Sequence, residues 1–128
     1  MSGVTHTPLG WEKDAILTDY VLKALTSTEG QDFVFAVSVQ GHGGYPDLPM
    51  ESEEAAISAY HPEKSEEWNN AFSYYVNQIH EMDAFVGALT DDLTALGEDT
   101  VLVLYGDHLP ALELTEDDLG TGSLFDTE

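Results

Sequence analysis

The chain has 128 residues and a strong excess of acid, with 25 Asp and Glu against 3 Lys and Arg and a formal net charge of -22. This length suits one domain with a modest core. The charge argues against binding to nucleic acid or to an anionic membrane surface, and we expect a solvated, self-repelling exterior. No cysteine is present, so the fold uses no disulfide. We expect neither a membrane-spanning segment, which needs roughly 20 apolar residues, nor a signal peptide.

Residues 1–10 are predicted to be a polar lead, and their opening Met1-Ser2-Gly3 is typical of an added start. A helix is predicted over residues 11–25, because apolar side chains from Trp11 to Leu25 recur at helical spacing. Glu12 and Asp14 would then lie in its first turn, where the helix dipole favours carboxylates. The chain therefore begins with a helix behind a short lead.

An apolar run without alternation follows at Phe33–Val39. Such a run predicts a strand buried on both faces, which is typical of a parallel sheet flanked by helices. The run leads into Gln40–Pro46, where three glycines surround His42. Because glycine lets the backbone approach a ligand closely, His42 is a candidate binding residue. The alternative is a solvated histidine in a glycine-rich loop.

A long helix is predicted over Ser65–Leu96, after an acidic, proline-punctuated connection. Ser65 has the character of an N-cap, and Gly97 stands where a helix commonly ends. The apolar side chains from Trp68 to Leu96 advance by threes and fours, so we interpret them as a core face.

The other histidines carry weaker signals. His80 and Asp83 are three residues apart on the long helix and therefore share a face. They could be hydrogen-bond partners of residues that bind a metal or substrate, although solvated or capping roles are commoner. His6 and His61 are interpreted as surface residues.

The second candidate site follows another apolar run, Thr100–Tyr105, which predicts a second buried strand. Asp107 and His108 come directly after Gly106. A carboxylate beside an imidazole suits zinc, manganese or iron, and the alternative is a turn with a surface histidine. A strand, a long helix and another strand predict a parallel pair. We therefore expect His42 and the Asp107–His108 pair at the same edge of one sheet.

Three sequence blocks together carry a family resemblance: VSVQGHGGY, FSYYVNQIHEMDAFVGAL and EDTVLVLYGDHLPAL. In order and spacing they resemble the carboxy-terminal half of a lipoteichoic acid synthase-like sulfatase domain, in the alkaline phosphatase superfamily. The resemblance runs from about Trp11 to the end. It implies an α/β fold class, a partial alkaline phosphatase/sulfatase-like fold with a mainly parallel sheet flanked by helices. Residues 11–128 would be the carboxy-terminal portion of this catalytic domain.

The resemblance also implies roles for the candidate residues. Asp107 and His108 would be metal ligands for Mn²⁺ or another divalent ion. His42 would lie in the substrate pocket, although Gly41 stands where the family often has asparagine. The family's threonine nucleophile and a glutamate ligand would lie upstream, so no catalytic residue is identified here. With an incomplete metal shell, the fragment is expected to be inactive alone.

For the parent protein, the resemblance implies a metal-dependent phosphoglycerol transferase or sulfatase-type enzyme of lipoteichoic acid synthesis. Its substrate would be a phosphatidylglycerol-like lipid or another phospho or sulfo ester, at the extracellular face of a bacterial cell membrane. Two alternatives remain open: a non-catalytic module of the same fold that binds an anionic ligand, and a fragment with only a structural role. An exposed sheet edge would be covered by another copy, giving a homo-oligomer.

Overall fold

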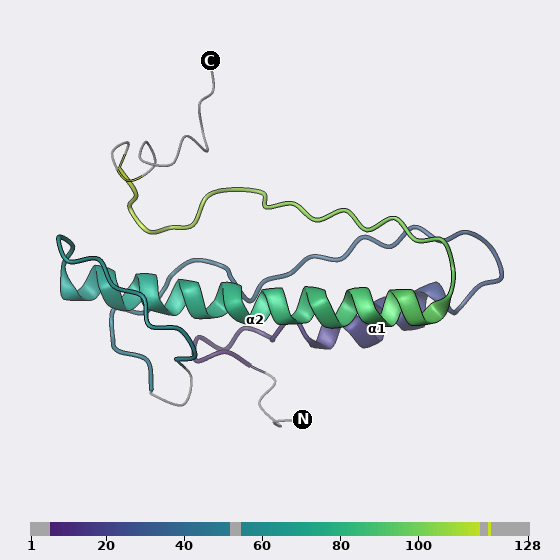
Figure 1. Ribbon diagram of the computed structural model, residues 1–128, viewed down its shortest axis with the longest axis horizontal. Helices are drawn as coiled ribbons and strands as arrows, with labels where there is room; N and C mark the ends of the chain where they lie inside the picture. The colour runs from purple at the N-terminus through teal and green to yellow at the C-terminus, as the bar shows by residue number, and fades with distance from the viewer. Residues whose placement is uncertain (1–5, 52–54, 116–117, 119–128) are drawn as a thin grey trace, which may run out of the picture.

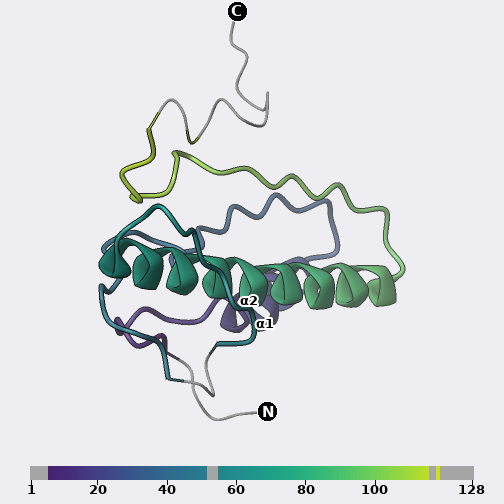
Figure 2. The same ribbon diagram turned by 60° about the vertical axis from the view of Figure 1, so that its left-hand side comes forward.

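The computed structural model describes residues 6–51, 55–115 and 118. Within them lie two helices, α1 (Ile16–Leu25) and α2 (Glu66–Leu96), which contact each other. Figures 1 and 2 show α2 as the long axis of the molecule, with the other segments laid along it. Neither helix is both long enough and apolar enough to cross a membrane. The extended segments that lead to the candidate site residues lie along α2 (Figures 1 and 2).

The predicted bounds of α2 are confirmed, because both ends carry the expected capping signals. The Ser65 hydroxyl accepts a hydrogen bond from the Trp68 amide at 3.2 Å. This satisfies one of the amides that the first turn of a helix leaves free. Gly97 ends the helix in the left-handed conformation, with φ of 72°, which glycine adopts without a steric penalty.

Helix α1 is shorter than predicted, because the chain forms a turn around residues 7–11 instead of a first helical turn. The Thr7 amide donates to the Trp11 carbonyl at 2.7 Å, and the Trp11 amide donates to the Thr7 hydroxyl at 3.1 Å. These bonds compete with helix formation in the way common for threonine and serine side chains. As a result, the helix begins at Ile16 and Trp11 lies outside it.

The predicted parallel sheet is wrong for the described residues. Residues 33–39 and 100–105 are extended and run side by side in the same direction along α2 (Figures 1 and 2), but neither is a strand. No backbone hydrogen bond joins them in the described part of the chain. A strand buried on both faces needs paired neighbours and a second covering layer. Here most of these apolar side chains are exposed instead.

The core is small and lies mostly on α2. Its buried apolar side chains among the described residues are Tyr74, Leu89, Leu93 and Leu112. The predicted apolar stripe is thus only partly buried, and two asparagines share the inner face. The Asn77 side chain accepts from the Ile57 amide and donates to the Ile57 carbonyl, both at 2.9 Å. Asn69 pairs with the backbone of His61 in the same way, so both amides fasten the preceding connection to α2.

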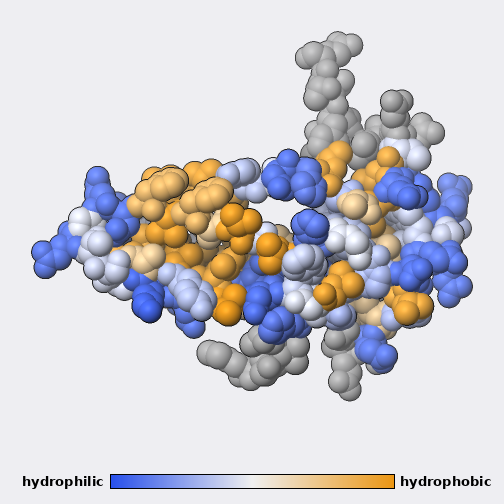
Figure 3. Space-filling model, turned by 180° about the vertical axis from the view of Figure 1, so that it is seen from behind, coloured by the Kyte–Doolittle hydropathy of each residue, from blue (hydrophilic) through white to orange (hydrophobic). Residues whose placement is uncertain are grey.

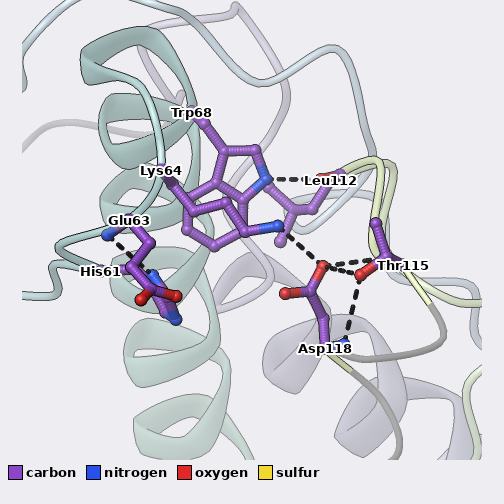
Figure 4. Close-up of polar contacts among 7 residues, drawn as sticks. All are labelled: His61, Glu63, Lys64, Trp68, Leu112, Thr115 and Asp118. Carbon is purple, nitrogen blue, oxygen red and sulfur yellow. Dashed lines mark hydrogen bonds and ion pairs between the residues drawn. The ribbon is translucent and has the colours of Figure 1, made fainter.

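A cluster of side chains at the start of α2 holds the segment that follows His108 (Figure 4). The Trp68 indole N–H donates to the Leu112 carbonyl at 2.7 Å. The Lys64 ammonium lies 5.2 Å from the centre of the Trp68 ring and 2.8 Å from the Asp118 carboxylate. Thr115 also donates to Asp118, through both its amide and its hydroxyl. The segment after His108 is thereby held against the N-terminal end of α2.

Candidate active site

The structure brings the two candidate loops together. His42 follows the extended segment 33–39, and Asp107 and His108 follow 100–105. The rings of His42 and His108 meet edge to face, with their centres 6.4 Å apart. The proximity expected for these residues is therefore observed, although the sheet edge that was expected to hold them is absent. Their roles as ligand and metal-binding residues stay predictions.

Two glycines permit this close approach. A Cβ atom at Gly43 would lie 2.9 Å from the Cβ of Ala111, closer than side-chain atoms pack. A Cβ atom at Gly41 would lie 3.0 Å from the Met82 sulfur on α2. A larger residue at Gly43 would force the His42 loop and the Ala111 segment apart, whereas at Gly41 the flexible Met82 side chain could adjust. The glycine-rich sequence thus serves packing in this structure.

The ring nitrogens of both histidines are arranged alike. Nδ1 of His42 lies 3.2 Å from the Gly43 carbonyl, and Nδ1 of His108 lies 2.8 Å from the Leu109 carbonyl. A carbonyl can only accept, so each contact favours the tautomer with the proton on Nδ1. Nε2 then carries the lone pair that a metal ion requires. Nε2 of His108 also lies 3.5 Å from the Asp107 carboxylate.

Trp11 joins the candidate site, and the sequence analysis missed it. Its ring centre lies 5.4 Å from that of His42, whereas the apolar spacing had placed Trp11 at the start of the first helix. The signal that could have placed it correctly is Thr7, whose hydroxyl captures the Trp11 amide. The indole remains partly exposed, so it forms one wall beside the histidine.

A buried polar network supports the His42 loop from below. Asp14 and Gln40 bond reciprocally: the Asp14 amide donates to the Gln40 side chain at 2.8 Å, and the Gln40 amide donates to the Asp14 carboxylate at 3.4 Å. The Gln40 side-chain amide also donates to Gln78 and Glu81 on α2. Ser38 completes the set by donating to Asp14 at 2.7 Å. Two residues before His42, Gln40 is therefore fixed to the segment that precedes α1 and to α2 itself.

Tyr45 closes the other side of the loop. Its hydroxyl donates to the Gly41 carbonyl at 3.1 Å, and its ring packs against Tyr74 and Tyr75. Burial, and secondarily the neighbouring Tyr75 hydroxyl, raise the pKa of Tyr45 above its usual range. The phenol consequently keeps its proton and remains a donor to the loop.

The other histidines lie away from this pair. His6 is within 2.9 Å of Glu12, and Nδ1 of His61 accepts from the Glu63 amide at 3.3 Å. His80 lines a pocket of about 340 Å³ together with Asp83. A further pocket, of about 500 Å³, lies beside Trp68 rather than at the candidate loops. None of these histidines lies with His42 and His108 in a common site.

The side chains of the candidate loops are of types that bind metal ions, but they are too few to form a complete metal site. Asp107, His42 and His108 offer one carboxylate and two imidazoles, a donor set that zinc or manganese accepts. However, the described residues contain no group of three or more His, Cys, Asp or Glu side chains arranged to hold a metal. The Asp107 side chain is 85% exposed. A metal bound there would need further ligands.

Comparisons with known proteins indicate the family of this chain. A protein of Rhizobium meliloti (strain 1021), named for cyclic β-1,2-glucan modification, is 29% identical over 99 residues, covering 77% of this chain. The chain spans only 15% of the length of that relative. No solved structure was found to match. The profile of the Sulfatase family matches residues 4–124, and the chain therefore belongs to the sulfatase family.

Proposed function

We propose that the His42 and Asp107–His108 loops form part of the active centre of a metal-dependent phospho- or sulfo-ester transferase or hydrolase. Membership of the sulfatase family supports this reaction class. The approach of His42 to His108, from segments more than sixty residues apart in the chain, is the observation that carries the proposal to these residues. The close contact of Gly43 with Ala111, beside the His108 loop, supports the same pairing.

Each residue would have a distinct role. Asp107 and His108 would ligate a divalent ion, with Mn²⁺ as the proposed metal. His42 would face the anionic group of the substrate, with Nε2 directed away from the Gly43 carbonyl. The metal would supply charge stabilisation for the transferred group. A threonine nucleophile and the remaining ligands would come from outside these 128 residues, so the chain alone is proposed to be inactive.

For the substrate, we propose a phosphatidylglycerol-like donor and a hydroxyl-rich acceptor at the outer face of the cell membrane. The donor, the acceptor and this location rest on the resemblance to lipoteichoic acid synthase-like proteins. The relative's name, which refers to modification of a glucan, is consistent with a hydroxyl-rich acceptor. The partly exposed Trp11 indole beside His42 would offer a flat apolar wall for such a molecule.

A non-catalytic module that binds an anion directly is less consistent with the structure. Asp107 is exposed next to His108, so an anion arriving without a metal would meet a carboxylate. The net charge of -22 adds long-range repulsion. Binding of an anion only after a divalent ion is added supports the metal-dependent proposal, whereas binding of inorganic phosphate without metal would favour the module.

The test is calorimetric titration of the chain with Mn²⁺, combined with NMR of the histidine rings under Zn²⁺. We expect Asp107→Ala/His108→Ala to weaken the tightest binding step at least roughly tenfold, because two ligands are removed. The matched control is Asp83→Ala/His80→Ala, which removes the same residue types from α2. Zn²⁺ should shift the His42 and His108 signals before those of the other histidines. Equal weakening in both double variants would contradict the proposal, because it would show diffuse binding to acidic side chains.

A further inference from the structure

Asp14 is a buried carboxylate to which the proposed chemistry assigns no role. The residue is 2% exposed and lies two positions before α1 begins. One of its carboxylate oxygens accepts from the Ser38 hydroxyl at 2.7 Å, and the other accepts from the Gln40 amide at 3.4 Å. A buried carboxylate is costly unless its oxygens are hydrogen-bonded. Both donors belong to the chain that leads to His42, so Asp14 holds this chain four and two residues before the histidine.

Apolar burial does little to hold the same stretch of chain. Phe35 and Val37 are 67% and 63% exposed, and Figure 3 shows a broad apolar area over the half of the molecule that carries the C-terminal end of α2. In the described part of the chain, no backbone-to-backbone hydrogen bond engages residues 33–38. The polar contacts with Asp14 and α2 are therefore the contacts that fix the chain before His42.

Asp14 is also close in sequence to the indole that packs on His42. Trp11 precedes it by three residues, and the ring centres of Trp11 and His42 lie 5.4 Å apart with their planes at 53°. The Asp14 amide donates to the Gln40 side chain at 2.8 Å. Asp14 therefore ties the backbone that carries the indole to the backbone that carries the imidazole.

The neighbouring residue fastens this arrangement to α2. The Lys13 ammonium donates to the Glu81 carboxylate at 2.8 Å. The Gln40 side chain donates to the same carboxylate and, at 3.1 Å, to Gln78. Each side of the contact between Asp14 and Gln40 thus has its own bond to the helix, which provides a rigid base for it.

We propose that Asp14 is a positioning residue for His42, and that it holds the imidazole ring in place through the Gln40 backbone and the Trp11 indole. The inference rests on the proposed function, in which Nε2 of His42 faces the anionic group of the substrate. An aspartate suits this role better than an asparagine. It presents two acceptor oxygens to its two donors, whereas an asparagine side chain presents one oxygen and one NH₂ group, which cannot accept. Loss of either bond would loosen the chain before His42 and the orientation of its ring.

The test is NMR of the His42 ring in the whole 128-residue chain, without metal and at about pH 8, above the range in which histidine ordinarily titrates. The Trp11 indole shifts nearby ring protons, and Trp11→Leu measures its contribution to the His42 signals. We expect Asp14→Asn, which is nearly the same size, to lose most of this contribution, because one donor then faces an NH₂ group. The matched control is Asn69→Ala, which removes a buried side chain that bonds the backbone of His61 instead. It should keep the His42 signals even where stability falls.

Ser38 provides a second pair of variants, which keeps the test decisive if Asp14→Asn does not fold. Ser38→Ala removes one donor to the carboxylate and should lose part of the Trp11 contribution. Ser38→Thr retains the hydroxyl at an exposed position and should keep the signals of the unaltered chain. Circular dichroism of α2 verifies that each variant is folded.

Unchanged His42 signals in folded Asp14→Asn or Ser38→Ala would overturn the proposal. Equal losses in Asn69→Ala would also overturn it, because they would show a general loosening of the fold, as would equal losses in Ser38→Ala and Ser38→Thr. No metal or substrate enters these measurements. Failure of the Mn²⁺ titration would therefore contradict the proposed function while leaving Asp14 as the residue that holds His42, and the reverse result would contradict only the role of Asp14.

Discussion

Gly43 determines how closely the two candidate loops approach. A methyl group there would meet Ala111 at 2.9 Å, so Gly43→Ala should move the loops apart. We expect the nuclear Overhauser contacts between the His42 and His108 rings to weaken and divalent-metal binding to fall with them. Gly30→Ala is the control, because no atom lies within 4 Å of its added Cβ. Unchanged ring contacts in Gly43→Ala would show that the loops adjust without consequence.

Gln40 is the second residue on which the site depends. Gln40→Leu would leave the Asp14 amide and the Gln78 side chain without their buried partner. Each unsatisfied group costs about 1–3 kcal/mol, so we expect the free energy of unfolding to fall by at least the lower value. Urea denaturation measures this change. A loss indistinguishable from zero would mean that water replaces the amide and that the network does not hold the loop.

At the scale of elements, α2 depends on its N-cap. Ser65→Ala removes the acceptor of the Trp68 amide and should lower the free energy of unfolding by about 1 kcal/mol. Ser73→Ala, inside the same helix, is the matched control and should have a smaller effect, because alanine favours the helix interior. Thermal unfolding followed at the helix signal distinguishes the two. Equal losses would show that the cap is not a specific source of stability.

The cluster at the start of α2 should respond to pH in one direction. The Lys64 ammonium, together with the Thr115 amide and hydroxyl, holds the pKa of Asp118 far below its usual range. Because this pKa is lowered on folding, its contribution is complete above the ordinary aspartate value of about 3.9 and is lost as the pH falls below it. The stability difference from Asp118→Asn should therefore be constant from about pH 5 to 8 and shrink in stronger acid. A difference that grows in acid would contradict this assignment.

The helix was predictable from sequence because its determinants are local. Ser65 and Gly97 mark its ends within one turn of the backbone they cap. The sheet was predicted wrongly, because burial of Phe33–Val39 on two faces depends on partners that no local pattern specifies. For the candidate site, the pairing of His42 with Asp107–His108 followed from their positions after apolar runs. Trp11 was missed because a hydrogen bond to Thr7 outweighed an apolar spacing typical of a helix.

The molecule as a whole has few of the parts that catalysis requires. Its buried apolar core is small in the described part of the chain, where no group of three or more His, Cys, Asp or Glu side chains is arranged to hold a metal. We expect no turnover of phosphodiester or sulfate-ester test substrates by this chain, with or without added Mn²⁺. The parallel control is Asp107→Ala, which should be equally inactive. Mn²⁺-dependent turnover that disappears in Asp107→Ala would refute the claim that the chain is inactive alone.

The hydrogen bond between Trp68 and Leu112 requires residues 97–112 to run back along nearly the whole length of α2. From Trp68 to Gly97 the helix extends roughly 44 Å, at about 1.5 Å per residue. The return from Gly97 to Leu112 can reach only about 50 Å when fully extended. The segment must therefore run extended over most of its length to bring Leu112 back to Trp68. Removing residues between Gly97 and Leu112 should strain the Trp68 bond, whereas adding residues would introduce slack and loosen the distance between His108 and His42.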